Sequence, residues 1–97
     1  MSVSEIHVIL NEDDTAFFGP AARLGDYDIP ASYREFEGML TDRLAAEYPW
    51  AKIHVEVRSG PNLFRAYDLL FADKIEEELP RITHEVWETF NWTIEAD

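Results

Sequence analysis

Residues 52–58 alternate between apolar and polar side chains without a break, and this pattern limits the folds open to the chain. Ile53, Val55 and Val57 fall on one side of an extended backbone, because successive side chains of a strand point to opposite faces. The residues between and beside them are all polar: Lys52, His54, Glu56 and Arg58. A strand with one apolar face belongs to a sheet that is covered on one side.

Two other segments are expected to complete the sheet. Residues 5–10 are a short, mostly apolar run that stops at the polar residues 11–14. Residues 63–67 follow a turn at 59–62, and we interpret them as a third strand that forms a hairpin with residues 52–58. A helix that starts over 63–67 is the alternative.

Helical spacing marks two further segments. The first begins after Pro30, where Ser32 and Glu35 have the spacing of a capping box, and Pro49 ends it near Tyr48. Its apolar residues share one face: Tyr33, Phe36, Leu40 and Leu44. The second stripe crosses a proline at position 80, which predicts a kink or a break: Phe71, Ile75, Leu79, Ile82, Val86 and Phe90.

These segments predict a single α+β domain over residues 1–97. Its order is β-α-β-β-α, with a small antiparallel sheet of about three strands and two helices packed on one face. Residues 15–31 are expected to form an ordered loop folded onto the core, and residues 92–94 are a candidate short strand. The chain has 97 residues, 46% of them hydrophobic, which is enough for one core and too few for two.

The sequence lacks the residues that most enzyme classes require. It has no cysteine, its four glycines are scattered, and His84, Glu85 and Glu88 lack the second histidine of a zinc protease motif. We therefore expect a protein that is not an enzyme and that uses no metal ion and no cofactor. The absence of cysteine and of a signal peptide or membrane-spanning run predicts a cytoplasmic location.

The formal net charge is −12, from 20 acidic and 8 basic residues, which exceeds what solubility requires. The acids are grouped. Residues 66–97 hold nine acids against Lys74 and Arg81, and residues 5–14 hold four acids and no Lys or Arg. Such a charge opposes direct binding to nucleic acid or to anionic membranes and favours a basic partner.

On a regular second helix, several carboxylates project opposite the apolar stripe and form an acidic ridge. The predicted partner-binding residues are therefore Asp73, Glu76, Glu77 and Glu88 on this helix, Glu12, Asp13 and Asp14 after the first strand, and Glu85 and Trp87 as supporting contacts. Trp87 is either an exposed anchor or, if the proline rotates it inward, a core residue. A row of carboxylates has the sign and roughly the pitch of successive DNA phosphates.

In these properties the chain resembles the small acidic inhibitors that phages and mobile elements direct against host DNA-binding machinery, including DNA-mimicking anti-CRISPR and anti-restriction proteins. The resemblance lies in length, composition and the acidic helix, and no family motif is matched. It implies a non-enzymatic inhibitor that mimics DNA phosphates and occupies the DNA-binding channel of a basic host protein or complex. Two alternatives remain open: a non-mimic interaction module such as an immunity or antitoxin protein, and a salt-adapted acidic domain of unrelated function.

Overall fold

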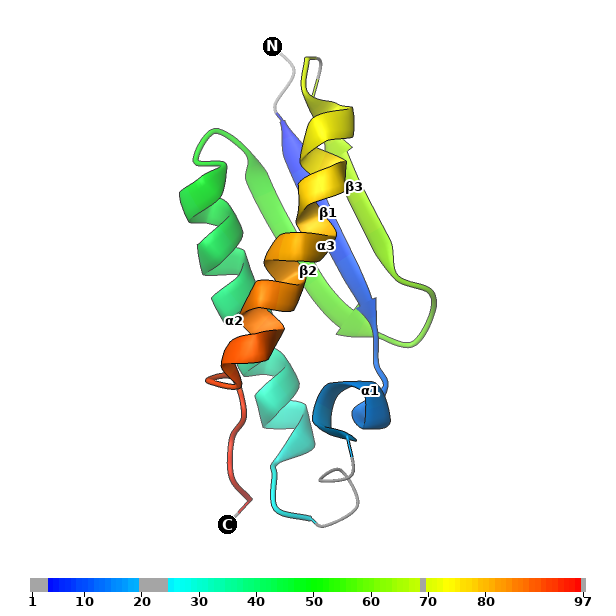
Figure 1. Ribbon diagram of the computed structural model, residues 1–97, viewed down its shortest axis with the longest axis vertical. Helices are drawn as coiled ribbons and strands as arrows, with labels where there is room; N and C mark the ends of the chain where they lie inside the picture. Colours follow the sequence, from blue (N-terminus) through cyan, green and yellow to red (C-terminus); the bar gives the residue numbers. More distant parts are fainter. Residues whose placement is uncertain (1–3, 20–24, 69, 97) are drawn as a thin grey trace.

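A three-stranded sheet with helices on one face forms the protein (Figure 1). The computed structural model describes residues 4–19, 25–68 and 70–96. The strands are β1 (Glu5–Asn11), β2 (Lys52–Arg58) and β3 (Leu63–Tyr67), and the helices are α1 (Asp14–Phe18), α2 (Ile29–Glu47) and α3 (Ala72–Thr89). The α+β class and the order β-α-β-β-α of the main elements are confirmed, with α1 as an additional short helix.

The sheet is mixed, with strand order β2-β1-β3, so the expected antiparallel sheet with a hairpin between residues 52–58 and 63–67 is wrong in its pairing. His7 of β1 lies opposite His54 in the parallel β2 and opposite Arg65 in the antiparallel β3. The reason is the crossover through α2, which returns the chain in its original direction. On the outer edge of β2, the Val57 N–H donates to Glu37 of α2 at 2.9 Å.

The loop between β2 and β3 crosses the end of β1 and is fixed there. Asn62 accepts a hydrogen bond from the Asn11 N–H at 2.7 Å, and the Glu12 N–H donates to the Arg58 carbonyl at 2.9 Å. These contacts carry the chain to the free edge of β1. As a result β3 is a strand, as predicted, although its partner is β1.

Helix α2 begins before the predicted capping box. Asp28 is the N-cap and accepts a hydrogen bond from the Ala31 N–H at 3.2 Å, while Pro30 lies in the first turn, where a missing N–H leaves no helix bond unmade. Ser32 is buried instead; its hydroxyl donates to the Asp28 carbonyl and accepts from the Ile94 N–H, both at 2.8 Å. The capping role predicted for Ser32 and Glu35 is therefore wrong.

Helix α3 continues through Pro80, and its axis bends along its length in Figure 1. The middle of the predicted stripe is buried: Ile75, Leu79, Ile82 and Val86. Its two ends are not, because Phe71 and Phe90 flank the helix and are 57% and 49% exposed. No helix in the described part of the chain is long and apolar enough to cross a membrane.

Both main helices cover the face of the sheet that carries Ile6, Val8 and Leu10, with α2 over β2 and α3 over β3 (Figure 1). The core continues past the sheet into an aromatic cluster centred on the fully buried Trp92. The rings of three residues lie within 5.2–5.7 Å of it: Phe17, Phe18 and Phe36.

The segment predicted to be an ordered loop, residues 15–31, contributes to this cluster, although Asp14–Phe18 is helical and residues 20–24 lie outside the described part. The predicted strand at 92–94 is absent; the tail instead makes a single antiparallel bridge between Tyr27 and Glu95. The bridge places the tail beside the start of α2.

Candidate binding site

Three segments that are far apart in the sequence meet at one end of the molecule. The Asp28 N–H donates to the Ile94 carbonyl at 2.7 Å and the Ala96 N–H to the Asp26 carbonyl at 2.9 Å, which joins the tail to the start of α2. The Tyr33 hydroxyl of α2 donates to Asp14 of α1 at 2.5 Å. Residues 12–14, 26–28 and 94–96 together hold six acids and no base: Glu12, Asp13, Asp14, Asp26, Asp28 and Glu95. We call these six residues the acidic end.

Three carboxylates of the acidic end also accept hydrogen bonds that stabilise the local structure. Asp13 accepts from the Ala16 N–H at 3.1 Å at the start of α1, and Asp28 caps α2. Asp14 accepts from Tyr33, and burial together with this hydrogen bond raises the pKa of the Tyr33 hydroxyl. The negative charge is therefore fixed on ordered backbone at these positions.

The predicted ridge along α3 is interrupted in the middle. Glu85 accepts hydrogen bonds from Arg43 of α2 and from Arg81, each at 2.7 Å. The hydrogen bond from Arg43 is the main cause of the lowered pKa of the Glu85 carboxyl, and Arg81 adds to it. With a cation on each side, Glu85 contributes little net negative charge to the helix surface.

Four of the remaining α3 acids form two groups, whereas the fifth, Glu78, accepts a hydrogen bond from the Tyr48 hydroxyl at 2.9 Å. Asp73 and Glu77 are exposed and make no ion pair within the described part of the chain, and Glu76 lies 3.5 Å from Arg65 of β3. Glu88 lies at the other end of the helix, 2.6 Å from His84. At roughly 1.5 Å per residue, Glu77 and Glu88 are about 17 Å apart along the helix.

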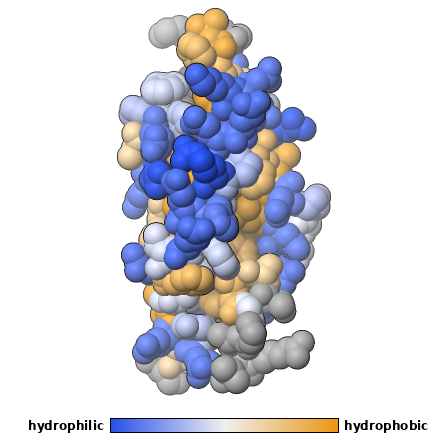
Figure 2. Space-filling model, in the orientation of Figure 1, coloured by the Kyte–Doolittle hydropathy of each residue, from blue (hydrophilic) through white to orange (hydrophobic). Residues whose placement is uncertain are grey.

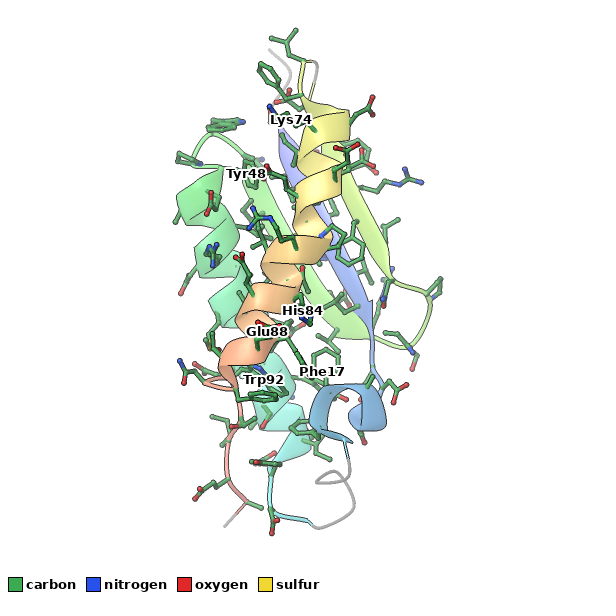
Figure 3. All side chains as sticks on the ribbon, viewed as in Figure 1. Phe17, Tyr48, Lys74, His84, Glu88 and Trp92 are labelled. Atoms are coloured by element: carbon green, nitrogen blue, oxygen red, sulfur yellow. The ribbon has the colours of Figure 1, made fainter. Side chains whose placement is uncertain are left out.

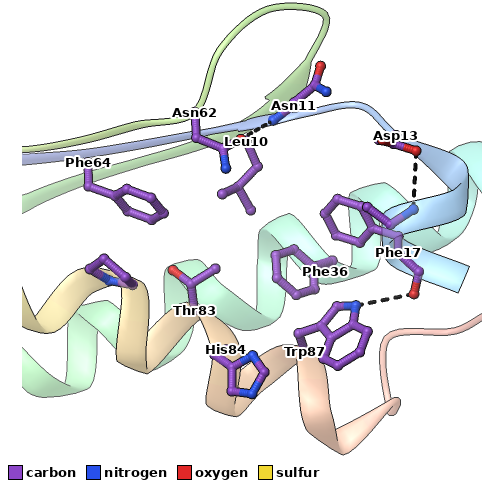
Figure 4. Close-up of a pocket in the computed structure, with 12 residues that line it drawn as sticks. Leu10, Asn11, Asp13, Phe17, Phe36, Asn62, Phe64, Thr83, His84 and Trp87 are labelled. Carbon is purple, nitrogen blue, oxygen red and sulfur yellow. Dashed lines mark hydrogen bonds between the residues drawn. The ribbon is translucent and has the colours of Figure 1, made fainter. Parts of the chain in front are cut away.

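A pocket of about 440 Å³ opens beside the second group, between α3, α1 and the ends of β1 and β3 (Figures 3 and 4). Its lining is largely aromatic and aliphatic, with polar groups among it: Leu10, Asn11, Asp13, Ala16, Phe17, Phe36, Asn62, Phe64, Pro80, Thr83, His84 and Trp87. Its volume and its mainly apolar lining with a few polar groups fall within the range of known ligand sites.

Trp87 forms one wall of this pocket and is half-buried. Its indole N–H donates to the Phe17 carbonyl at 3.1 Å, and its ring stacks on His84 with the ring centres 5.7 Å apart. It is therefore neither a free anchor nor a core residue, but a half-buried side chain held in place in the pocket lining.

The structure brings some of the predicted residues together and separates others. Asp13 and Trp87 both line the pocket, and Glu88 adjoins it through His84. Glu12 and Asp14 flank Asp13 in the chain. Four predicted residues lie elsewhere: Asp73, Glu76, Glu77 and Glu85.

Sequence reasoning missed four residues of this region: Asp26, Asp28, Thr83 and Glu95. The candidate strand at the C-terminus was the one signal that pointed towards the tail, but nothing in the sequence shows that the tail pairs with residues 26–28. Thr83 carries no motif. Its position matters only because α3 turns it towards the pocket.

No group of three or more His, Asp or Glu side chains that could hold a metal ion exists within the described residues. Comparisons of the chain with models of protein families, with curated proteins and with solved structures find no match. The function of the site is therefore inferred from its own residues.

Proposed function

We propose that the protein is a non-enzymatic inhibitor that binds a basic nucleic-acid-binding protein or complex through an acidic surface that mimics DNA phosphates. An anti-CRISPR protein that blocks target DNA binding is one example of this class. The observation that carries the proposal is the acidic end, where three separate segments contribute six acids and no base. Fixed negative charges of this density complement a groove lined by Lys and Arg.

The inhibitor acts by occupying the nucleic-acid groove of its partner. The negative field of the chain speeds its encounter with a basic groove, and the bound acidic end excludes nucleic acid from the same cations. Three acids in the first two turns of α3, Asp73, Glu76 and Glu77, offer a second contact further along the molecule. Binding therefore weakens as salt rises, while the fold persists.

Competition with duplex DNA tests the proposal. The protein is immobilised, its partner is captured from host extract and identified, and duplex DNA is then added in excess. Displacement of the partner by DNA supports mimicry, and retention of the partner at saturating DNA contradicts it.

Three double charge reversals, which change the net charge equally, locate the surface. Asp26→Lys with Glu95→Lys alters the acidic end at exposed side chains without an ion pair in the described part of the chain. We expect at least about a tenfold loss of affinity, as for two close charge contacts.

The second pair, Glu76→Lys with Glu77→Lys, changes the first turns of α3 and is expected to weaken binding by less than the acidic-end pair. The third pair, Glu35→Lys with Asp42→Lys, changes two exposed α2 residues outside the proposed surface and serves as the control. Equal losses in all three proteins would mean that bulk charge alone matters.

A non-mimic interaction module, such as an immunity or antitoxin protein, is the second candidate. It is favoured by the Arg43, Glu85 and Arg81 network, because this network breaks the row of carboxylates that a continuous phosphate path requires. Such a module binds one basic partner away from its nucleic-acid groove, so DNA does not displace it. The competition experiment therefore separates the two candidates.

A salt-adapted domain is distinguished by its folding. A halophilic domain unfolds when salt falls below roughly molar concentrations, whereas the proposed inhibitor stays folded at low salt and binds most tightly there. Circular dichroism across a salt series makes this measurement.

A further inference from the structure

Three large apolar side chains are exposed at the end of the molecule where the α2–β2 loop and the β3–α3 loop lie (Figure 1). Trp50 and Phe71 are each 57% exposed, and Leu70 is 81% exposed. We call these three residues the apolar tip, and Figure 2 shows a hydrophobic cap at this end. The molecule is 48 Å long, and the acidic end lies at its opposite end.

The three residues of the apolar tip form one surface. Trp50 and Phe71 line the same hollow of about 220 Å³, and Leu70 and Phe71 line a second hollow of about 340 Å³. Phe71 therefore joins the two loops. At the usual size of such side chains, their exposed area is roughly 400 Å². A contiguous apolar patch of this size is typical of an interaction site.

The backbone beneath the apolar tip is fixed by hydrogen bonds. The Asp68 carboxylate accepts from the N–H groups of Leu70 and Phe71 at 2.9 and 2.8 Å, and these bonds are the main cause of its lowered pKa. On the other loop, Trp50 packs edge-on against Tyr48 with the ring centres 5.8 Å apart. Because little ordering of the loops is needed when the apolar tip is covered, association costs less free energy.

The charges around the apolar tip are of both signs. Lys52 and Lys74 are the two lysines of the chain, and both are exposed beside the tip and make no ion pair within the described residues. The exposed Asp73 is next to Lys74. The lysines make this end less favourable for a basic partner than the acidic end, and the net charge of −12 repels an anionic surface. A second copy offers carboxylates to the lysines and apolar side chains to the tip, which is the complementarity that a two-fold interface requires.

The position of the apolar tip also favours a second copy as its partner. Two molecules of net charge −12 repel each other, but between exposed charges this repulsion is screened over about 8 Å at physiological ionic strength. Contact through the apolar tips places the two acidic ends at the far ends of the dimer. The most acidic surfaces therefore add little to the repulsion between the copies.

We infer that two copies of the chain associate through their apolar tips in a two-fold symmetric dimer. With neighbouring side chains included, the buried area is about 1,000 Å², which is small for a stable dimer, so the association is weak and reversible. The dimer presents two acidic ends that point away from each other. The inference goes beyond the proposed function and does not rest on it, because none of the six residues of the acidic end takes part in the contact.

Sedimentation equilibrium of the whole chain, at protein concentrations from about 10 µM to about 1 mM, tests the inference. We expect the mass to rise from that of one chain towards that of two and no further, because a two-fold contact is closed. Raising NaCl from about 0.1 M to about 0.5 M should leave the dimer intact or strengthen it, since salt screens the repulsion between the copies.

Two matched variants locate the contact. Phe71→Ser removes a central side chain of the apolar tip and should weaken dimerisation by about tenfold or more, with an unchanged circular dichroism spectrum. Phe90→Ser is the control, because it removes a ring that is 49% exposed at the other end of α3. It should leave dimerisation unchanged. In the unaltered chain, the NMR signal of the Trp50 indole N–H should shift with protein concentration, and that of Trp87 should not.

A mass of one chain at every concentration overturns the inference, and so does a mass that rises beyond two chains. Dissociation of the dimer by salt, or equal losses for Phe71→Ser and Phe90→Ser, would place the contact elsewhere and also overturns it. If the chain stays monomeric while Phe71→Ser loses the partner captured from host extract, the apolar tip belongs to that partner and the inference is wrong. Displacement of the partner by DNA is measured separately, so failure of the inference and failure of the proposed function are distinguishable.

Discussion

The acidic end and the opposite end of the molecule use aromatic residues in different ways. At the apolar tip, opposite the acidic end, Trp50 and Phe71 face outwards and are more than half exposed. At the acidic end the large aromatic residue, Trp92, is fully buried.

The difference shows that the exposed carboxylates of the acidic end belong to a tightly packed part of the molecule. Carboxylates of the acidic end lie over the cluster of Trp92, Phe17 and Phe36, which holds α1, α2 and the tail to one another. At the apolar tip, Trp50 contacts Tyr48 at a ring distance of 5.8 Å and is otherwise largely exposed. The charges of the acidic end are thus pre-positioned, which favours recognition, because less side-chain and loop ordering is needed on binding.

Replacing the tryptophan at each end gives the largest expected effect. Trp92→Ala should lower the free energy of unfolding by about 3–5 kcal/mol, because it leaves a cavity in the aromatic cluster and removes the hydrogen bond from its indole to the Trp87 carbonyl. Trp50→Ala, the matched change at the apolar tip, should cost less than about 1 kcal/mol. Urea unfolding followed by circular dichroism measures both. Similar losses would mean that the two ends do not differ in the way proposed.

Thr83→Val tests a second buried side chain, which lies on α3. It removes a buried hydroxyl that has no partner, and we expect a gain in unfolding free energy of about 1 kcal/mol. Thr41→Val is the matched control, because the Thr41 hydroxyl donates to the Glu37 carbonyl at 2.6 Å, and should lose about 1 kcal/mol. A loss for Thr83→Val as large as for Thr41→Val would show that the hydroxyl has a partner in solution.

Local patterns in the sequence are sufficient to predict most of the fold. The alternation in 52–58 and the stripe of α2 correspond to residues that the structure places as expected, because both patterns record which face of an element is buried. The pairing of β3 was not predictable in this way. It depends on the crossover through α2 and on Asn11 and Asn62, which fix the loop across the end of β1.

The candidate site was less accessible to sequence reasoning. Helical spacing correctly indicated that Asp73, Glu77 and Glu88 are exposed, but it could not show that Arg43 of another helix neutralises Glu85. The acidic end likewise depends on long-range pairing of the tail with residues 26–28, which leaves no periodic signal. Charge can be counted from a sequence, whereas its grouping in space depends on tertiary contacts.

Glu85 lies between the two groups of α3 acids, and its titration gives the smallest predicted effect. Its pKa is lowered in the folded protein, so the pair with Arg43 and Arg81 stabilises the fold above the ordinary carboxyl pKa of 4.5, and this contribution is lost as pH falls below that value. Glu85→Gln removes this contribution, whereas Glu77→Gln removes an α3 carboxylate that makes no ion pair in the described part of the chain. Between pH 5 and about pH 3 we therefore expect the unfolding free energy of Glu85→Gln to fall less steeply than that of Glu77→Gln. Measured by urea unfolding at each pH, equal slopes would show that Arg43 and Arg81 do not hold Glu85 in solution, and the acidic ridge of α3 would then be continuous.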